Sequence, residues 1–351
     1  MERVLRAVPV CFVVFAPLGW AAEEAGNNSG SNSLQNVTQT QLEKLVKSGR
    51  SAFYKGSYEE ADRIYQKVIK QAEAAGVQGV LLARTTYELG AMRKVEGRCD
   101  EAVPLIQRGL AMLTVYRPRP GEASGLYPGE ITTVWEVLGA ARACDYDYTQ
   151  AEHAYHKALE AEQTSPAPRR HTLFEIQSNL GSVYQEEGKY PQAQANYEAA
   201  QALQDDPQVD PISRALLAGT YGPLLRALGR EAEAADMIQS GLAAVRTAAG
   251  SDGSTAVILL NAMALIQTDR KAYGEAAQLL AEAIDRMDKG AAFRPGDRAR
   301  VLRNYALCLR KMGEKKRARE IESQAAQLTA GLRPDATRGP LVDVSELAAK
   351  H

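Results

Sequence analysis

The stretch NLGSVYQEEGKYPQAQANYEAA, residues 179–200, contains the pattern that decides the fold of this chain. A large residue followed by a small one, Leu180-Gly181, precedes a turn at Gly188, and small and aromatic residues then follow at helical spacing: Ala193, Tyr197 and Ala200. Small residues let two helices cross closely, and large residues fill the space between neighbouring pairs. The stretch therefore predicts two helices joined by a short turn.

The same pattern recurs along most of the chain. The first alanine of each predicted second helix marks the repeat, at Ala61, Ala102, Ala151, Ala193, Ala234, Ala276 and Ala318. The intervals between these alanines are 41, 49, 42, 41, 42 and 42 residues. The small residue of each first helix is Gly49, Gly90, Gly139, Gly181, Gly222, Ala264 or Ala306. A spacing this regular predicts about seven helix–turn–helix units.

These residues resemble the signature of the tetratricopeptide repeat (TPR), with Leu-Gly and an aromatic on the first helix and Gly, Ala and an aromatic after it. A plain unit of that family has about 34 residues. The longer period resembles the long-helix, kinesin-light-chain-like subclass, in which each helix gains about one turn of 3.6 residues. The resemblance covers Gln41 to Leu328 and implies an all-α, right-handed solenoid of about seven repeats.

The composition favours a folded helical protein. The chain has 351 residues, of which 45% are hydrophobic and 24% charged, and this is too apolar for a disordered chain. The formal net charge is −1, so no basic field favours nucleic acid as a partner. We expect neither a nucleic-acid partner nor stable membrane insertion after the N-terminal signal is removed.

The first residues are typical of an export signal. Arg3 and Arg6 precede an apolar run from Ala7 to Trp20, and the small residues Gly19 and Ala21 predict cleavage before Ala22. The run is shorter than the roughly 20 residues that span a bilayer, and an uncleaved anchor is the alternative. The sequence thus predicts an exported protein, either periplasmic or secreted.

The predicted organisation has four parts. Residues 1–21 are a signal peptide, 22–40 a flexible linker rich in Gly, Asn and Ser, 41–330 the TPR solenoid, and 331–351 a C-terminal tail. The 49-residue interval contains a Pro/Gly cluster over residues 116–129, which predicts a long connection between the second and third hairpins. In the last repeat Glu322 replaces the aromatic residue, as expected of a terminal repeat that faces water.

Three cysteines remain after the predicted cleavage: Cys99, Cys144 and Cys308. Cys99 lies at the turn of the second repeat and Cys144 near the end of the first helix of the third, on the same edge of adjacent hairpins. In an oxidising compartment this placement suggests a disulfide between them, and two buried thiols are the alternative.

The sequence offers little for catalysis. His153 and His156 lie three apart, as metal ligands can, but Tyr155 and Ala158 define the buried stripe of that helix. We therefore expect both histidines at the solvated flanks, with no metal and no cofactor. No Gly-rich phosphate loop and no activated nucleophile is recognisable. The sequence predicts a protein that binds and is not an enzyme.

The resemblance implies that the first helices line a concave groove in which family members hold peptides. The residues expected to bind there are Ser178, Asn179, Ser182, Asn261, Arg300, Arg303, Asn304, Arg310 and Lys311. Asparagine amides can both donate to and accept from an extended backbone, and a basic cluster favours an acidic segment or a free C-terminal carboxylate. The alternative for the basic cluster is a solvated charged face.

Two functions follow from this. The first is an exported interaction scaffold that binds an extended peptide or a partner protein in its groove. The second is a structural or assembly component of the cell envelope, in which the outer face makes the contacts and the groove stays idle.

Overall fold

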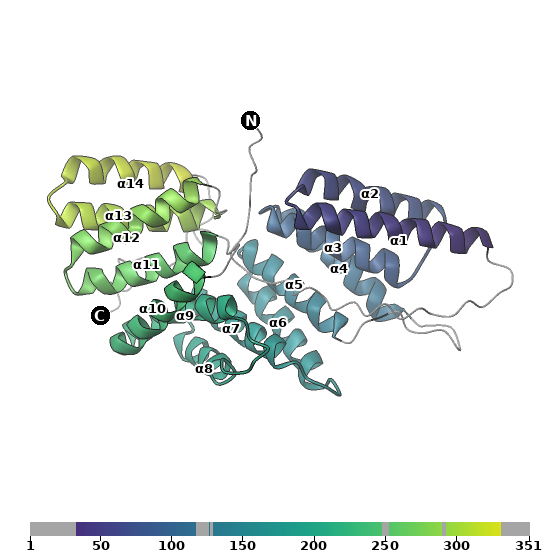
Figure 1. Ribbon diagram of the computed structural model, residues 1–351, viewed down its shortest axis with the longest axis horizontal. Helices are drawn as coiled ribbons and strands as arrows, with labels where there is room; N and C mark the ends of the chain where they lie inside the picture. Colours follow the sequence, from purple (N-terminus) through teal and green to yellow (C-terminus); the bar gives the residue numbers. More distant parts are fainter. Residues whose placement is uncertain (1–32, 117–125, 127–128, 248–252, 290–292, 331–351) are drawn as a thin grey trace. The chain divides into compact units, whose positions relative to one another are not determined.

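The computed structural model describes residues 33–116, 126, 129–247, 253–289 and 293–330. Within those residues the chain forms fourteen α-helices and no strand (Figure 1). Seven helix–turn–helix repeats require this number, so the predicted all-α repeat solenoid is confirmed. The helices are α1 (Ser33–Tyr54), α2 (Tyr58–Ala74), α3 (Val80–Val95), α4 (Cys99–Val115), α5 (Glu130–Cys144), α6 (Tyr148–Gln163), α7 (Arg170–Glu186), α8 (Tyr190–Gln201), α9 (Pro211–Ala227), α10 (Glu231–Thr247), α11 (Gly253–Asp269), α12 (Tyr273–Asp288), α13 (Pro295–Lys311) and α14 (Lys315–Thr329).

Consecutive helices pack as pairs, and neighbouring pairs pack on one another. α1 packs on α2, α3 on α4, α7 on α8, α9 on α10, α11 on α12, and α13 on α14. Contacts such as those of α4 with α5 and of α12 with α13 link successive pairs. The described residues divide into two compact units, one that ends at Asp145 and one that begins at Tyr146.

The small residues sit where the two helices of a pair cross. All seven marker alanines lie on even-numbered helices and are 0% exposed. A Cβ atom added at Gly90 would lie 2.7 Å from Ile106 Cγ1 and 2.9 Å from the carbonyl oxygen of Ala102. A larger residue would therefore push α3 away from α4, which is the physical reason for the small residues of the pattern.

The turns inside the pairs share one backbone conformation. Two residues before each second helix, the chain has a positive φ, which glycine adopts without strain. Glycine occupies five of these positions: Gly56, Gly97, Gly188, Gly229 and Gly313. Tyr146 and Lys271 occupy the other two, each with a φ of 61°. Six of the turns also share a hydrogen bond from the next amide to the carbonyl five residues earlier, as in Lys189 N to Tyr184 O at 2.8 Å.

The long connection between the second and third repeats is where the Pro/Gly cluster predicts it. Helix α4 ends at Val115 and α5 begins at Glu130. Residues 117–125 and 127–128 of the connection lie outside the described residues. Except for α1 with 22 residues and α8 with 12, each helix has 15 to 17 residues. The kinesin-light-chain-like subclass stays a prediction.

A disulfide joins Cys99 and Cys144, with their Cα atoms 5.9 Å apart. Cys99 is the first residue of α4 and Cys144 the last residue of α5, and both are buried. Of the two alternatives that the sequence leaves open, the structure has the bonded one. The third cysteine, Cys308, is a buried free thiol on α13.

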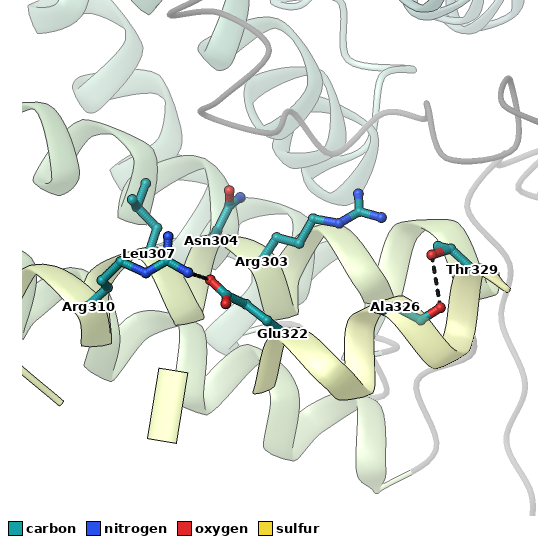
Figure 2. Close-up of a pocket in the computed structure, with 7 residues that line it drawn as sticks. All are labelled: Arg303, Asn304, Leu307, Arg310, Glu322, Ala326 and Thr329. Atoms are coloured by element: carbon teal, nitrogen blue, oxygen red, sulfur yellow. Dashed lines mark hydrogen bonds and ion pairs between the residues drawn. The ribbon is translucent and has the colours of Figure 1, made fainter. Parts of the chain in front are cut away.

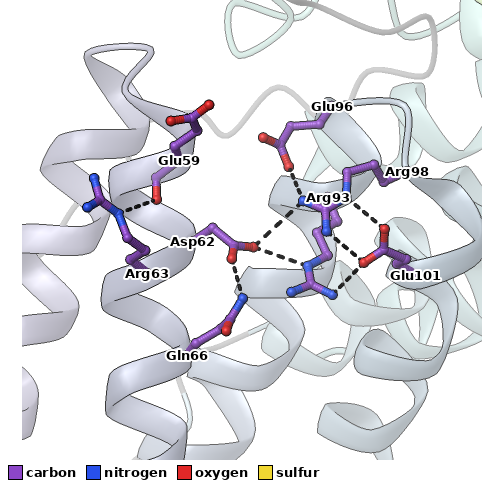
Figure 3. A network of polar contacts seen from close by, with 8 residues as sticks. All are labelled: Glu59, Asp62, Arg63, Gln66, Arg93, Glu96, Arg98 and Glu101. Carbon is purple, nitrogen blue, oxygen red and sulfur yellow. Dashed lines mark hydrogen bonds and ion pairs between the residues drawn. The ribbon is translucent and has the colours of Figure 1, made fainter.

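Ion pairs connect the second helix of one repeat to the turn of the next. In the first unit, Asp62 on α2 accepts from Arg93 at the end of α3 at 3.2 Å and lies 3.9 Å from Arg98 at the start of α4 (Figure 3). In the second unit the corresponding pairs are Glu152–Lys189 at 2.8 Å, Glu198–Arg230 at 3.0 Å and Glu231–Arg270 at 2.7 Å. Each such partly exposed pair stabilises the contact between neighbouring repeats by about 0.2–1 kcal/mol.

The predicted domain boundaries need one correction. Helix α1 begins at Ser33, inside the range 22–40 that the sequence predicts as a flexible linker. No glycine or proline occurs between Gly30 and Gly49, so nothing in that stretch interrupts a helix. The predicted signal peptide and the tail over 331–351 lie outside the described residues. Among the helices that the structure describes, none combines the length and the apolar character needed to cross a bilayer.

Candidate functional site

A pocket of about 420 Å³ lies on the last helix pair (Figure 2). Residues one and two turns apart on α13 and α14 line it, because side chains at i, i+4 and i+7 share one face of a helix. From α13 these are Arg303, Asn304, Leu307 and Arg310, and from α14 they are Glu322, Ala326 and Thr329. Three of the residues predicted to bind a peptide, namely Arg303, Asn304 and Arg310, are therefore brought together.

Asn304 is held in place from the neighbouring repeat. Its side-chain Nδ2 donates to Oδ1 of Asn261 on α11 at 3.0 Å. Asn304 is 3% exposed and Asn261 is 1% exposed. The two predicted asparagines thus meet, but Asn261 supports Asn304 from inside and does not line the pocket. A buried amide pair of this kind fixes the position of the pocket wall, because leaving either group unpaired is costly.

Arg310 on α13 is paired with a carboxylate from the same chain. It forms an ion pair with Glu322 on α14, across the pocket (Figure 2). The two side chains are 53% and 37% exposed, so the pair is solvated and of the weak surface kind. The prediction that Glu322 faces water at the end of the array is met only in part, since its carboxylate is also a pocket group. Figure 2 shows the Arg303 side chain extending away from this pair.

Arg300 lies apart from the pocket. It is 1% exposed, and its guanidinium donates to Asp297 Oδ1 at 2.7 Å. The same carboxylate accepts from Arg294 Nε at 2.7 Å. The sequence places Arg300 on the basic face, but the structure buries it near the start of α13, where it completes an ion cluster. The accessible basic residues of the predicted face are therefore Arg303, Arg310 and the exposed Lys311, which does not line the pocket.

The predicted residues on α7 are not part of the pocket. Ser178, Asn179 and Ser182 are half-buried on that helix. The hydroxyl of Ser178 donates to the carbonyl oxygen of Phe174 at 2.8 Å, one turn earlier in the same helix. Their role in binding stays a prediction.

The two histidines lie at the solvated flanks of α6, as the sequence predicts, since both are exposed. His156 Nε2 lies 2.8 Å from the Tyr184 hydroxyl, which donates to Glu152 Oε1 at 3.0 Å. Burial, together with the hydrogen bond to Glu152, raises the pKa of Tyr184 to about 12. The tyrosine therefore stays protonated at neutral pH and acts as a hydrogen-bond donor between neighbouring repeats.

Sequence reasoning missed the contribution of α14 to the pocket. Glu322, Ala326 and Thr329 share one face of that helix, opposite the predicted residues of α13. One signal was available, because Glu322 stands where the repeat pattern has an aromatic residue. At a terminal repeat, exposure to water explains such a departure, but here Glu322 also supplies a carboxylate to the pocket.

The helix pairs and their crossings define a protein of the α-helical repeat class. Residues 130–206 match the family model described as tetratricopeptide repeat. The match spans α5 to α8, so this part of the chain consists of tetratricopeptide repeats, and the paired helices elsewhere continue the same architecture. A comparison with curated protein sequences finds no match.

Several solved structures have a similar fold. The apo form of RapI superposes with a TM-score of 0.62 at 12% identity, over 83% of this chain and 98% of that one. The apo form of the quorum sensor NprR from B. thuringiensis gives 0.61 at 18%, over 84% and 80%. The Rap conjugation gene regulator of the plasmid pLS20, in complex with the Phr* peptide, gives 0.57 at 15%, over 88% and 80%. At these identities the likeness concerns the fold.

Proposed function

We propose that this chain is an exported, non-catalytic scaffold that binds an acidic peptide segment, or the free carboxyl terminus of a partner protein, at the pocket on α13 and α14. The pocket itself carries the proposal. It combines the cationic side chains of Arg303 and Arg310 with the apolar side chains of Leu307 and Ala326. Small sites with an apolar lining and a few convergent polar groups are typical of binding pockets.

The chemistry of Arg310 supports an acidic ligand. A guanidinium matches a carboxylate geometrically, and such charge-assisted hydrogen bonds are roughly twice as strong as neutral ones. Arg310 already forms this contact with the carboxylate of Glu322. The position beside the Arg310 guanidinium therefore accommodates a carboxylate. Because both side chains remain partly exposed, a ligand carboxylate can replace Glu322 without first opening a buried ion pair.

The comparisons support a peptide or protein as the ligand. One protein of similar fold is a gene regulator solved in complex with a peptide, and another is a quorum sensor. These activities belong to those proteins. They favour the scaffold over the idle-groove alternative because they show that an array of this kind can hold a peptide.

The export part of the proposal has separate support. Disulfides persist in oxidising compartments and are rare in the cytosol of most organisms. The Cys99–Cys144 bond therefore agrees with the predicted signal peptide. Mass spectrometry of the protein recovered from the envelope and from the medium should find Ala22 as the first residue. An intact Met1 in both fractions would contradict cleavage.

The binding experiment uses a fluorescein-labelled acidic peptide and fluorescence anisotropy with the full chain. Arg310→Glu should weaken binding by about tenfold or more, since a hydrogen bond to a charged group contributes about 1.5–3 kcal/mol. Arg319→Glu is the matched control, because Arg319 is exposed on α14, does not line the pocket and undergoes the same change of charge.

The outcomes separate the two functions. If only Arg310→Glu loses affinity for the acidic peptide, and added salt makes that difference from the wild type smaller, the result supports binding at the pocket. Equal losses in both variants would mean that only overall charge matters. No binding of any acidic peptide, with either a free or an amidated carboxyl terminus, would refute the proposed ligand and leave the envelope component with an idle groove as the better explanation.

A further inference from the structure

A buried ion cluster lies at the start of α13. Arg294, Asp297 and Arg300 occupy successive turns there. Arg294 Nε lies 2.7 Å from Asp297 Oδ2, and Arg300 Nη2 lies 2.7 Å from Asp297 Oδ1. The side chains of Asp297 and Arg300 are 1% and 2% exposed, and that of Arg294 is 13% exposed. Local spacing creates the cluster, because residues three apart on a helix are neighbours. Its burial, however, requires a cover from elsewhere in the chain.

Two tyrosines contribute to that cover, one in the turn before α6 and one at the first residue of α6. The guanidinium carbon of Arg294 lies 4.6 Å from the ring centroid of Tyr146, within the range of a cation–π contact. Tyr148, the first residue of α6, interacts electrostatically with Arg294, Asp297 and Arg300. Its buried hydroxyl has no hydrogen-bond partner among the described residues, and burial raises the pKa of Tyr148. These contacts join the start of α6 to the start of α13, two segments that are far apart in the sequence.

The backbone of Tyr146 shows that its side chain has a role beyond the turn. Tyr146 has a φ of 61° at the position where five of the other turns have glycine. An L-amino acid is disfavoured in this conformation, and glycine is not. If the turn were all that mattered, glycine would be the better residue at 146. Strain of this kind persists where the surrounding structure compensates for it.

We infer that Tyr146 is a clasp residue, which stacks on Arg294 and thereby holds the start of α13 against the start of α6. In a simple solenoid each repeat contacts only its neighbours, so repeats far apart along the chain are not coupled directly. The Tyr146–Arg294 contact links repeats that are not neighbours. The helices between them, α7 to α12, consequently form one cooperative block with α13, which carries four pocket residues, including the asparagine held by Asn261.

The chain contains a matched control for this inference. Lys271 has the same φ of 61° at the same position of its turn, and it is exposed. Lys271→Gly should relieve the backbone and raise the thermal midpoint of the second unit by about 2–4 °C. Tyr146→Gly relieves the same backbone conformation but removes the stacked ring. The clasp predicts no gain in the midpoint and at least about tenfold faster amide exchange over residues 298–302. Tyr146→Phe keeps the ring and should retain wild-type protection.

Hydrogen exchange followed by mass spectrometry on the full chain gives the answer. Faster exchange in Tyr146→Gly, with Tyr146→Phe and Lys271→Gly unaffected over residues 298–302, supports the clasp. A gain in midpoint equal to that of Lys271→Gly, with unchanged exchange over residues 298–302, would overturn it. If Tyr146→Phe loses as much protection as Tyr146→Gly, the ring is not the holding group and the inference also fails. In an Arg294→Gln background, Tyr146→Gly should add less than about a twofold change, because its partner is already gone.

Discussion

Removal of the Cys99–Cys144 disulfide is expected to destabilise the first unit selectively. The bond closes a loop with a sequence separation of 45 residues. For a loop of that length the chain-entropy relation gives a stabilisation of about 4 kcal/mol at 25 °C, and measured disulfides typically contribute about 2–4 kcal/mol. The loop includes the long connection between α4 and α5. The expected loss on replacing both cysteines with serine is therefore about 2–4 kcal/mol.

Tryptophan fluorescence can follow this loss locally. The chain has two tryptophans, and one of them, Trp20, lies in the predicted signal peptide. In the mature chain Trp135 on α5 is then the single reporter, nine residues before the bonded Cys144. With a urea m-value of about 2 kcal/mol/M, the midpoint of the Trp135 transition should fall by about 1–2 M in the double variant. A local reporter is needed because repeat arrays often unfold in more than one step.

Cys308→Ala provides the control. Cys308 is a buried free thiol on α13 in the second unit, so its truncation should leave the Trp135 midpoint nearly unchanged. Treating the wild-type protein with a reductant should reproduce the shift of the double serine variant, and the variant itself should not respond to it. If the double variant shifts the midpoint no more than Cys308→Ala does, the disulfide does not stabilise the unit in the way reasoned here.

Three further predictions concern packing, the pocket and the ion cluster. Gly90→Ala should destabilise by about 1–3 kcal/mol, because its Cβ would lie 2.7 Å from a core side chain. Gly274→Ala should stabilise by up to about 0.5–1 kcal/mol, because no atom lies within 4 Å of the added Cβ. If urea unfolding gives the two variants the same change in stability, this explanation by packing is wrong. Glu322→Gln should tighten binding of an acidic peptide by about two- to fivefold in the anisotropy assay, and weaker binding would count against competition for Arg310. Burial alone would raise the pKa of Asp297, but the charges of Arg294 and Arg300 outweigh burial and lower it. Its contribution is thus complete above about pH 4 and is lost as pH falls toward the folded-state pKa, so amide protection in α13 should drop there in the wild type and not in Asp297→Asn.

The sequence predicted the repeats well because their pattern is local and periodic. Each marker alanine has its partner within the same helix pair, so the spacing within one repeat is enough to show the crossing. Ala102 is a clear case, since its carbonyl oxygen would lie 2.9 Å from a Cβ at Gly90, only twelve residues earlier. The connection between α4 and α5 was equally predictable, because proline and glycine interrupt a helix through their own backbone preferences and need no distant contact.

The site was predicted only in part. Helical spacing correctly grouped Arg303, Asn304 and Arg310 on one face of α13. The same spacing included Arg300, although that residue is buried and pairs with Asp297. Spacing along one helix cannot show which of its turns another part of the chain covers. For the same reason it did not show that Glu322 on α14 meets Arg310.

By itself the sequence determined that this protein is an all-α array of paired helices. It also determined at which residues the helices of a pair cross and at which residues the array is interrupted. These properties follow from side-chain size and backbone preference within a few tens of residues. Only the tertiary structure decided that Cys99 bonds Cys144, that Asn304 is held by Asn261, and that Tyr146 stacks on Arg294. Such contacts join different repeats, and small changes in the stacking of each repeat on the next determine which side chains meet.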